Sequence, residues 1–212
     1  MAHITLYMPL IKLVVFYLSF TIHEIAHGYA AFWSGDHTPK KKGRLTLLPW
    51  KHMDMTGSVI VPGILFIMGS DTIIGWGKPV PVDFSAFSRP QHLWVASAGA
   101  LANLVLAGLG LVFYALTHTM MKDGCSVATQ AFCITGFMFL PINLVLCLFN
   151  IIPLCPFDGW VFFKGFSRKR KKIKDHRVHP LTVSMNIALA FVILKISTPF
   201  LIRLIKSMTI DF

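Results

Sequence analysis

Long apolar runs dominate the pattern of hydrophobic and polar positions along this chain. Lys12 is the only charged residue between positions 7 and 22, and residues 91–117 and 131–156 contain no Asp, Glu, Lys or Arg. A helix needs about 20 apolar residues to cross the ~30 Å hydrocarbon core of a bilayer. The pattern therefore predicts membrane-spanning helices at about residues 9–33, 92–117 and 131–152, and a last one at about residues 181–205.

The stretch between the first two of these helices has a different pattern. Residues 58–69 are mostly apolar, but Pro62 and Gly63 interrupt them, and residues 78–82 are rich in Pro and Val. Because Pro fixes φ and biases the preceding residue toward extended conformations, residues 78–82 are expected to be extended. Two interpretations stay open for this stretch: a re-entrant element that enters and leaves on one side, or a short span over residues 59–74.

Together these patterns predict an all-α polytopic membrane protein. It would have about four to five transmembrane helices, with a short re-entrant or extended β-like element between the first and second well-defined spans. Composition agrees, because 55% of the residues are hydrophobic and 14% are charged, against roughly 25% charged in soluble domains. The abundance of aliphatic residues and the presence of only four cysteines exclude a disordered chain, a collagen-like repeat and a disulfide-stapled scaffold.

The net charge of +11 is concentrated in two loops. Residues 164–179 hold eight Lys and Arg with one acid, Asp175, and residues 35–55 hold a second basic group. Short basic loops beside apolar helices stay in the cytoplasm. Anionic lipid head groups are the expected partner of the 164–179 loop, and nucleic acid is not, because interleaved aromatics are missing there. An even number of crossings must separate two cytoplasmic loops, which favours the re-entrant element.

The first predicted helix carries the residues with the clearest chemistry, His23, Glu24 and His27. Histidines at i and i+4 project from one helix face, so both imidazoles can bind one metal ion while the adjacent Glu reaches a bound water. Zinc suits two His and a carboxylate with a fourth position open for water. Three ionisable groups within one turn of a membrane helix are costly unless paired or coordinated, which favours a functional site.

A third metal ligand must come from elsewhere in the chain, and Asp158 is the best candidate. Pro153 and Pro156 break the fourth predicted helix just before it, and Gly159 permits a tight turn just after. An Asp that follows an uncharged run can also be a simple interfacial stop, and spacing alone leaves both interpretations open. The rival carboxylates are Asp36, Asp54 and Asp71.

With these two motifs in order, the sequence resembles the site-2 protease family of intramembrane zinc metalloproteases, and most closely its small bacterial-type members. The HExxH helix and the distant NxxPxxxxDG segment of that family match residues 23–27 and 150–159, and further similarity lies at residues 43–47, 75–82 and 98–103. The resemblance implies His23, His27 and Asp158 as zinc ligands and Glu24 as the catalytic acid/base.

The resemblance also implies an activity and a location. The activity is hydrolysis of peptide bonds in or near transmembrane segments of membrane-protein substrates, that is, regulated intramembrane proteolysis with Zn2+ as cofactor. The location is a bacterial-type cytoplasmic (inner) membrane, with several membrane passes. Residues 1–165 would form the intramembrane metalloprotease core, and residues 166–212 a basic cytoplasmic loop plus a C-terminal transmembrane helix. The alternative is a membrane zinc transporter or metal-binding scaffold without protease activity.

Two amides in the apolar helices remain to be assigned. Asn103 and Asn150 are candidates for binding the substrate backbone or the oxyanion. Hydrogen bonding between helices is the other interpretation of buried amides in membrane proteins. Residues 78–82 also have two interpretations. They form an edge to which an unwound substrate adds as a strand, or they are only a structural loop.

Overall fold

The computed structural model describes residues 2–68, 75–120 and 126–166, together with Thr182, Met185, Asn186, Leu189 and Val192. Predictions for the basic loop beyond Phe166 and for the helix at 181–205 therefore lie outside the continuously described residues. The described part is mainly helical, and no strand occurs in it.

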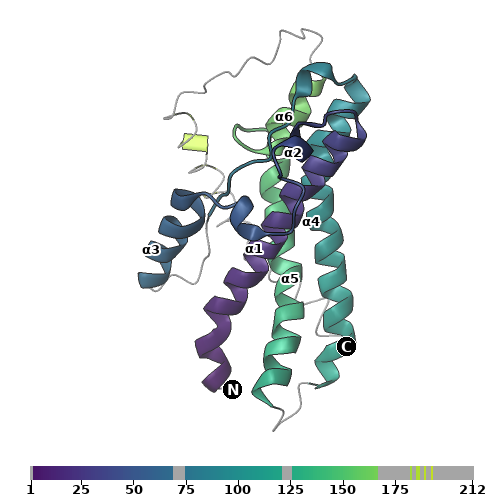
Figure 1. Ribbon diagram of the computed structural model, residues 1–212. Helices are drawn as coiled ribbons and strands as arrows, with labels where there is room; N and C mark the ends of the chain where they lie inside the picture. Colours follow the sequence, from purple (N-terminus) through teal and green to yellow (C-terminus); the bar gives the residue numbers. More distant parts are fainter. Residues whose placement is uncertain are drawn as a thin grey trace.

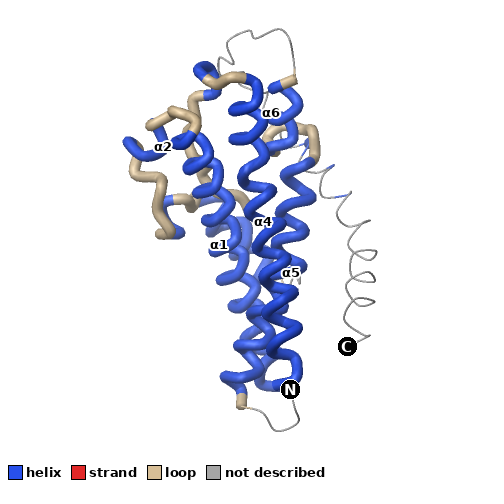
Figure 2. Tube along the Cα trace, turned by 90° about the vertical axis from the view of Figure 1, so that its right-hand side faces the viewer, coloured by secondary structure: helices blue, strands red, loops and turns tan. Residues whose placement is uncertain are grey.

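Three long helices form the body of the protein: α1 (Ala2–Trp33), α4 (Arg89–Thr117) and α5 (Val127–Ile151). Each packs against the other two, and the three run side by side in both views (Figures 1 and 2). By length and composition, all three are apolar enough to cross a membrane. The three best-defined predicted spans are therefore present, while the count of four to five stays a prediction.

Local sequence signals explain where these helices begin and end. At the start of α4, the Gln91 side chain accepts a hydrogen bond from the Ser88 backbone N–H at 2.9 Å, as in a capping box. At the start of α5, Ser126 Oγ accepts from Thr129 N at 3.1 Å. The sequence predicted a helix that starts at about residue 9. Helix α1 instead begins at Ala2, so Pro9 lies inside the helix.

Small residues line the contact between α1 and α4. Ala30 and Ala31 on α1 pack with Val95 and Ala98 on α4 in a buried cluster that also contains Phe87. Close packing of small side chains is the usual basis of helix association in membranes. This contact brings the two helices together one turn beyond His27, and so positions α4 beside the candidate site.

The stretch between α1 and α4 leaves the bundle and returns to it. A single π-helical segment, η2 (Met55–Ile60), continues into α3 (Val61–Ile67), which lies apart from the bundle in Figure 1. Met53 and Gly77, on either side of this excursion, form an isolated antiparallel bridge. The two sides of the excursion therefore meet at this bridge, and the re-entrant element stays a prediction. The β-like character of the described residues is limited to that bridge.

Short elements complete the fold around the two ends of the bundle. Helix α6 packs against α4 and α5, and α2 packs against α1. The remaining bounds are α2 (Thr38–Lys41), η1 (Pro49–Lys51), η3 (Phe84–Ala86), η4 (His118–Met120) and α6 (Asp158–Gly165).

Candidate metal centre

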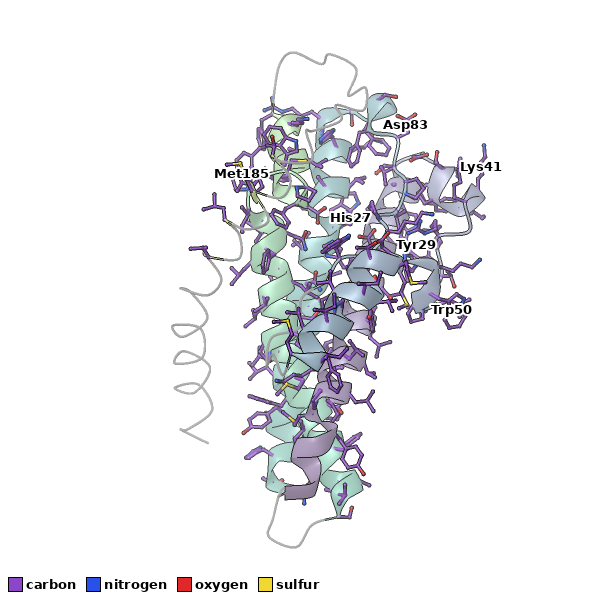
Figure 3. The ribbon with its side chains drawn as sticks, turned by 90° about the vertical axis from the view of Figure 1, so that its left-hand side faces the viewer. His27, Tyr29, Lys41, Trp50, Asp83 and Met185 are labelled. Carbon is purple, nitrogen blue, oxygen red and sulfur yellow. The ribbon has the colours of Figure 1, made fainter. Side chains whose placement is uncertain are left out.

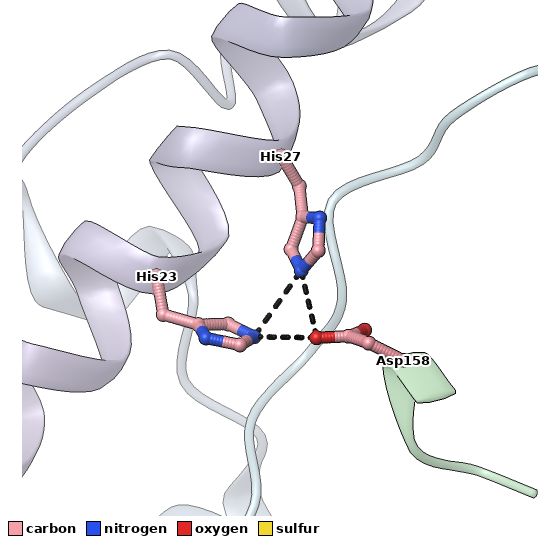
Figure 4. Close-up of side chains that lie close together, drawn as sticks. All are labelled: His23, His27 and Asp158. Carbon is pink, nitrogen blue, oxygen red and sulfur yellow. Dashed lines mark hydrogen bonds and ion pairs between the residues drawn. The ribbon is translucent and has the colours of Figure 1, made fainter. Parts of the chain in front are cut away.

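The structure brings His23, His27 and Asp158 to one point (Figure 4). The two Nε2 atoms lie 3.2 Å apart, and they are 3.1 Å (His23) and 3.0 Å (His27) from Asp158 Oδ2. Both histidines are buried, with exposed fractions of 4% and 8%. Their i, i+4 spacing on α1 explains why their rings converge.

Asp158 reaches the histidines because α5 ends early. The helix stops at Ile151, and after a short irregular segment that contains both prolines Asp158 opens α6. Gly159 is needed at this turn, since a Cβ there would lie 2.3 Å from the Ile151 carbonyl oxygen. The turn thereby places Asp158 Oδ2 next to both imidazoles.

The other ring nitrogen of each histidine has its own partner. His27 Nδ1 lies 2.7 Å from the Val95 carbonyl oxygen, and His23 Nδ1 lies 2.6 Å from Asn103 Oδ1. Each partner atom is an acceptor, so each Nδ1 carries a proton, and in the neutral ring the lone pair is then on Nε2, the atom that faces Asp158. Metal-binding histidines usually show this arrangement.

These residues fit a zinc ion. Two imidazole lone pairs and a carboxylate oxygen within 3.0–3.2 Å of one another repel unless a cation lies among them. A tetrahedral zinc with ligand bonds of about 2.0–2.2 Å separates its ligand atoms by roughly 3.3 Å. Gly99 on α4 leaves the necessary space, because a Cβ there would lie 2.3 Å from His27 Nε2 and 2.5 Å from His23 Cε1.

Gly99→Ala is therefore expected to disrupt the site while sparing the helix. The added methyl group must push the imidazoles from their positions, so zinc content should fall well below one ion per chain. Gly108→Ala on the same helix is the matched control, since nothing lies within 4 Å of its Cβ. Metal analysis of both purified variants checks this. Equal zinc in the two variants would mean that Gly99 does not border the metal.

Glu24 lies beside the three converging residues but does not join them. It is 7% exposed, and its Oε2 accepts a hydrogen bond of 2.7 Å from the Val80 backbone N–H. This bond fixes the carboxylate against residues 78–83, a segment without regular secondary structure. The position agrees with an acid/base role and not with metal coordination.

Charged side chains that sequence reasoning did not assign hold the same segment in place. The buried Arg44 donates from Nη2 to the Lys78 carbonyl, and Asp36 Oδ2 accepts from Asp83 N at 2.8 Å. Burial lowers the pKa of the Arg44 guanidinium below its ordinary value, and the negative charge of Glu24 offsets only part of this effect. Asp36 follows the end of α1, whereas Arg44 follows α2 and lies within residues 43–47, one of the regions that resemble the family.

The rival carboxylates have other uses in the described residues. Asp36 binds backbone N–H groups of Thr38 and Asp83, and Asp54 Oδ1 accepts from Gly57 N at 2.8 Å. Asp71 lies outside the described residues. Neither described rival belongs to the His23, His27 and Asp158 group.

The two candidate amides make hydrogen bonds within the bundle. Asn103 is fully buried, accepts from His23 and donates to Asn143 Oδ1 at 2.8 Å. Asn150 donates to the Leu146 carbonyl at 2.9 Å, within its own helix. Asn103 thus makes the interhelical hydrogen bonds that were one of its two interpretations from the sequence. Contact of either amide with substrate stays a prediction.

Fold and site together define a class of protein, a helical membrane protein with the residue set of a zinc metallopeptidase. That set is the buried His23 and His27, the partly buried Asp158 and the adjacent Glu24. Comparison with known sequences gives the family. Residues 11–193 match the model of peptidase family M50, and the chain belongs to this family, that of the site-2 proteases. The family predicted from the two motifs is confirmed.

Individual relatives carry consistent names. A Bacillus subtilis protein named "Putative zinc metalloprotease YwhC" is 37% identical over 145 residues, 68% of this chain and 63% of that protein. "Putative zinc metalloprotease Rip2" of Mycolicibacterium smegmatis is 29% identical over 144 residues, 68% of this chain and 52% of that protein. The chain thus spans between half and two thirds of the curated relatives it matches. No solved structure gives a significant match.

Proposed function

We propose that the protein is an intramembrane zinc endopeptidase that hydrolyses peptide bonds in or near transmembrane segments of membrane proteins, as a step in regulated intramembrane proteolysis. One observation carries the proposal. His23, His27 and Asp158 converge beside a buried Glu24 within a bundle of apolar helices. Family membership and the names of the relatives support the same activity.

His23, His27 and Asp158 would hold the zinc ion. When bound, zinc supplies a Lewis acid that polarises a carbonyl and lowers the pKa of water toward about 7. Glu24 is the group that accepts a proton during attack and returns it to the leaving nitrogen, since its carboxylate lies next to the metal ligands without joining them. The Val80 N–H on Oε2 orients the carboxylate, leaving Oε1 for proton transfer.

Segment 78–83, whose residues 78–82 the sequence predicts to be extended, is the proposed neighbour of the substrate. It passes directly beside Glu24, and Arg44 and Asp36 bind its backbone. A transmembrane helix must unwind before its amides become accessible, and an unwound chain can pair with an extended edge.

Cleavage by purified protein tests the activity. A panel of single-span membrane proteins is incubated with the full chain in detergent, before and after zinc removal by a chelator. We expect fragments cut within or next to the apolar segment, loss of cleavage after chelation, and recovery when zinc is restored. Cleavage that continues after complete zinc removal would contradict the proposal.

The same proposal places α2 and α6 on the cytoplasmic side of a bacterial-type inner membrane, with the basic loop beyond Phe166 beside anionic lipid head groups. Both helices lie at the end of the bundle opposite the N-terminus of α1 in Figure 1. Lys41, labelled in Figure 3, is exposed at that end. Since Lys and Arg concentrate there, the positive-inside rule gives the orientation.

Single cysteines in a cysteine-free background check this topology in sealed vesicles. Lys41→Cys and Lys164→Cys should react with an impermeant thiol reagent from the cytoplasmic side. Met120→Cys, in η4 just after α4, should react from the opposite side. Labelling of Lys41→Cys and Lys164→Cys from opposite sides would show that the excursion between Met53 and Gly77 crosses the membrane.

A further inference from the structure

A chain of buried hydrogen bonds connects His23 to residues that are not metal ligands. Asn103 on α4 bonds to His23, Asn143 on α5 bonds to Asn103, and Ser19 on α1 completes the chain. Ser19, Asn103 and Asn143 all have an exposed fraction of 0%. The chain therefore connects all three long helices, and no function derived above accounts for Asn143 or Ser19.

The direction of every bond in this chain follows from one fixed acceptor. The Phe139 backbone carbonyl has no hydrogen to donate, and it lies 2.8 Å from the amide nitrogen of Asn143. Asn143 must therefore direct Nδ2 toward Phe139 and Ser19, and Oδ1 toward Asn103. The Asn103 amide is then fixed as well, with Nδ2 donating to Asn143 at 2.8 Å and Oδ1 facing His23.

The last bond of the chain decides which nitrogen of His23 carries the proton. Asn103 Oδ1 lies 2.6 Å from His23 Nδ1 and can only accept, so the proton belongs on Nδ1. Nε2 then has a free lone pair, which metal binding requires. His27 obtains the same tautomer directly from the Val95 carbonyl. A backbone carbonyl cannot rotate, whereas a side-chain amide can exchange its oxygen and nitrogen.

We propose that Asn143 is a positioning residue of the metal site: by fixing the orientation of the Asn103 amide, it keeps His23 in the tautomer that binds zinc. Without an acceptor at position 143, the Asn103 NH2 group has a hydrogen-bond partner only if the amide turns toward His23. The turned amide donates to Nδ1 and moves the ring proton to Nε2, the atom that faces His27 and Asp158. Because Asn103 is fully buried, no solvent water can hydrogen-bond to its NH2 group in place of Asn143.

Replacement of Asn143 by Leu, which has a similar size and no hydrogen-bonding groups, tests the proposal. Zinc affinity is measured by chelator competition on the purified full chain, and the absorption spectrum of the Co2+-substituted protein reports ligand geometry. We expect affinity to fall by about 10–100-fold, the usual effect of losing a hydrogen-bond partner behind a metal ligand. Asn143→Ala, which removes the same acceptor without a branched side chain, should show the same fall.

Thr117→Val provides the matched control for loss of a buried hydrogen bond. Thr117 is 6% exposed on α4, and its Oγ1 donates to the Phe113 carbonyl within its own helix. Since this bond is not part of the chain to His23, zinc affinity and the Co2+ spectrum should stay parental. A similar loss in Thr117→Val would show that any buried polar deletion weakens the site, and would overturn the proposal.

A second background separates amide orientation from packing. Asn103→Leu removes the amide through which Asn143 would act, so in this background no group at position 103 depends on a partner at position 143. In this background Asn143→Leu should change zinc affinity by less than about twofold, which gives a strong coupling between the two positions. An equal loss in both backgrounds would mean that Asn143 acts through packing alone.

The inference rests on the proposed zinc site, and the parental protein distinguishes the two failures. A parental chain that binds no zinc would overturn the metal site and this inference with it. A parental chain that binds one zinc ion, with unchanged affinity and Co2+ spectrum in Asn143→Leu and Asn143→Ala, would overturn the inference alone.

Discussion

Glu24→Gln is expected to abolish cleavage while leaving about one zinc ion on each chain. Gln keeps the size of the side chain and can accept the Val80 N–H bond, but it cannot take up a proton. Loss of a general acid/base lowers rates by about 10²–10⁴-fold or more. Zinc content and cleavage rate, measured on the same purified sample, check this prediction.

The two measurements together separate a protease from a zinc transporter or scaffold. A transporter or scaffold would use His23, His27 and Asp158 but would gain nothing from a proton-transfer group beside them. A variant that still cleaves at the parental rate would remove Glu24 from catalysis. A variant that loses zinc and cleavage together would make Glu24 a ligand or a structural residue.

Asp158→Asn is expected to remove both zinc binding and cleavage. Asp158 Oδ2 is one of three ligand atoms, and a neutral amide oxygen is a much weaker ligand than a carboxylate. The loss of zinc affinity should exceed the ~10–100-fold caused by losing a hydrogen-bond partner behind a ligand. Metal analysis and chelator competition on purified protein measure it.

Asp54→Asn is the control for that prediction. The Asp54 side chain accepts a backbone hydrogen bond from Gly57, and the Asn oxygen can do the same, so zinc content should remain parental. Full zinc affinity in Asp158→Asn, or a loss confined to Asp54→Asn, would remove Asp158 from the site.

Much of the fold follows from sequence because the bilayer limits the possibilities. Apolar segments with few charges that are long enough to cross the hydrocarbon core indicate helices, and all three such segments among the described residues are helical. Their ends were less predictable. The sequence suggested a start near Pro9, but α1 begins at Ala2, because a proline within a membrane helix is tolerated where neighbouring groups satisfy the backbone.

Helix geometry alone predicted the two histidines of the candidate site, but not the position of Asp158. The i, i+4 spacing of His23 and His27 fixes one pair of imidazoles without further information. The approach of Asp158 depends on where α5 ends and how α6 packs, which spacing alone left open and the resemblance supplied. The residues that position the histidines were missed: Gly99 has no side chain, and Asn143 resembles any amide that joins two helices.

Zinc-edge X-ray absorption on the purified full chain identifies the atoms that bind the metal. We expect one zinc ion whose ligands are nitrogen and oxygen only, at about 2.0–2.2 Å, with the scattering pattern of two imidazoles. The described free cysteines offer the principal alternative ligands, since Cys133, Cys147 and Cys155 lie on or just after α5. A sulfur shell at about 2.3 Å, or a zinc ion without imidazole scattering, would contradict the site formed by His23, His27 and Asp158.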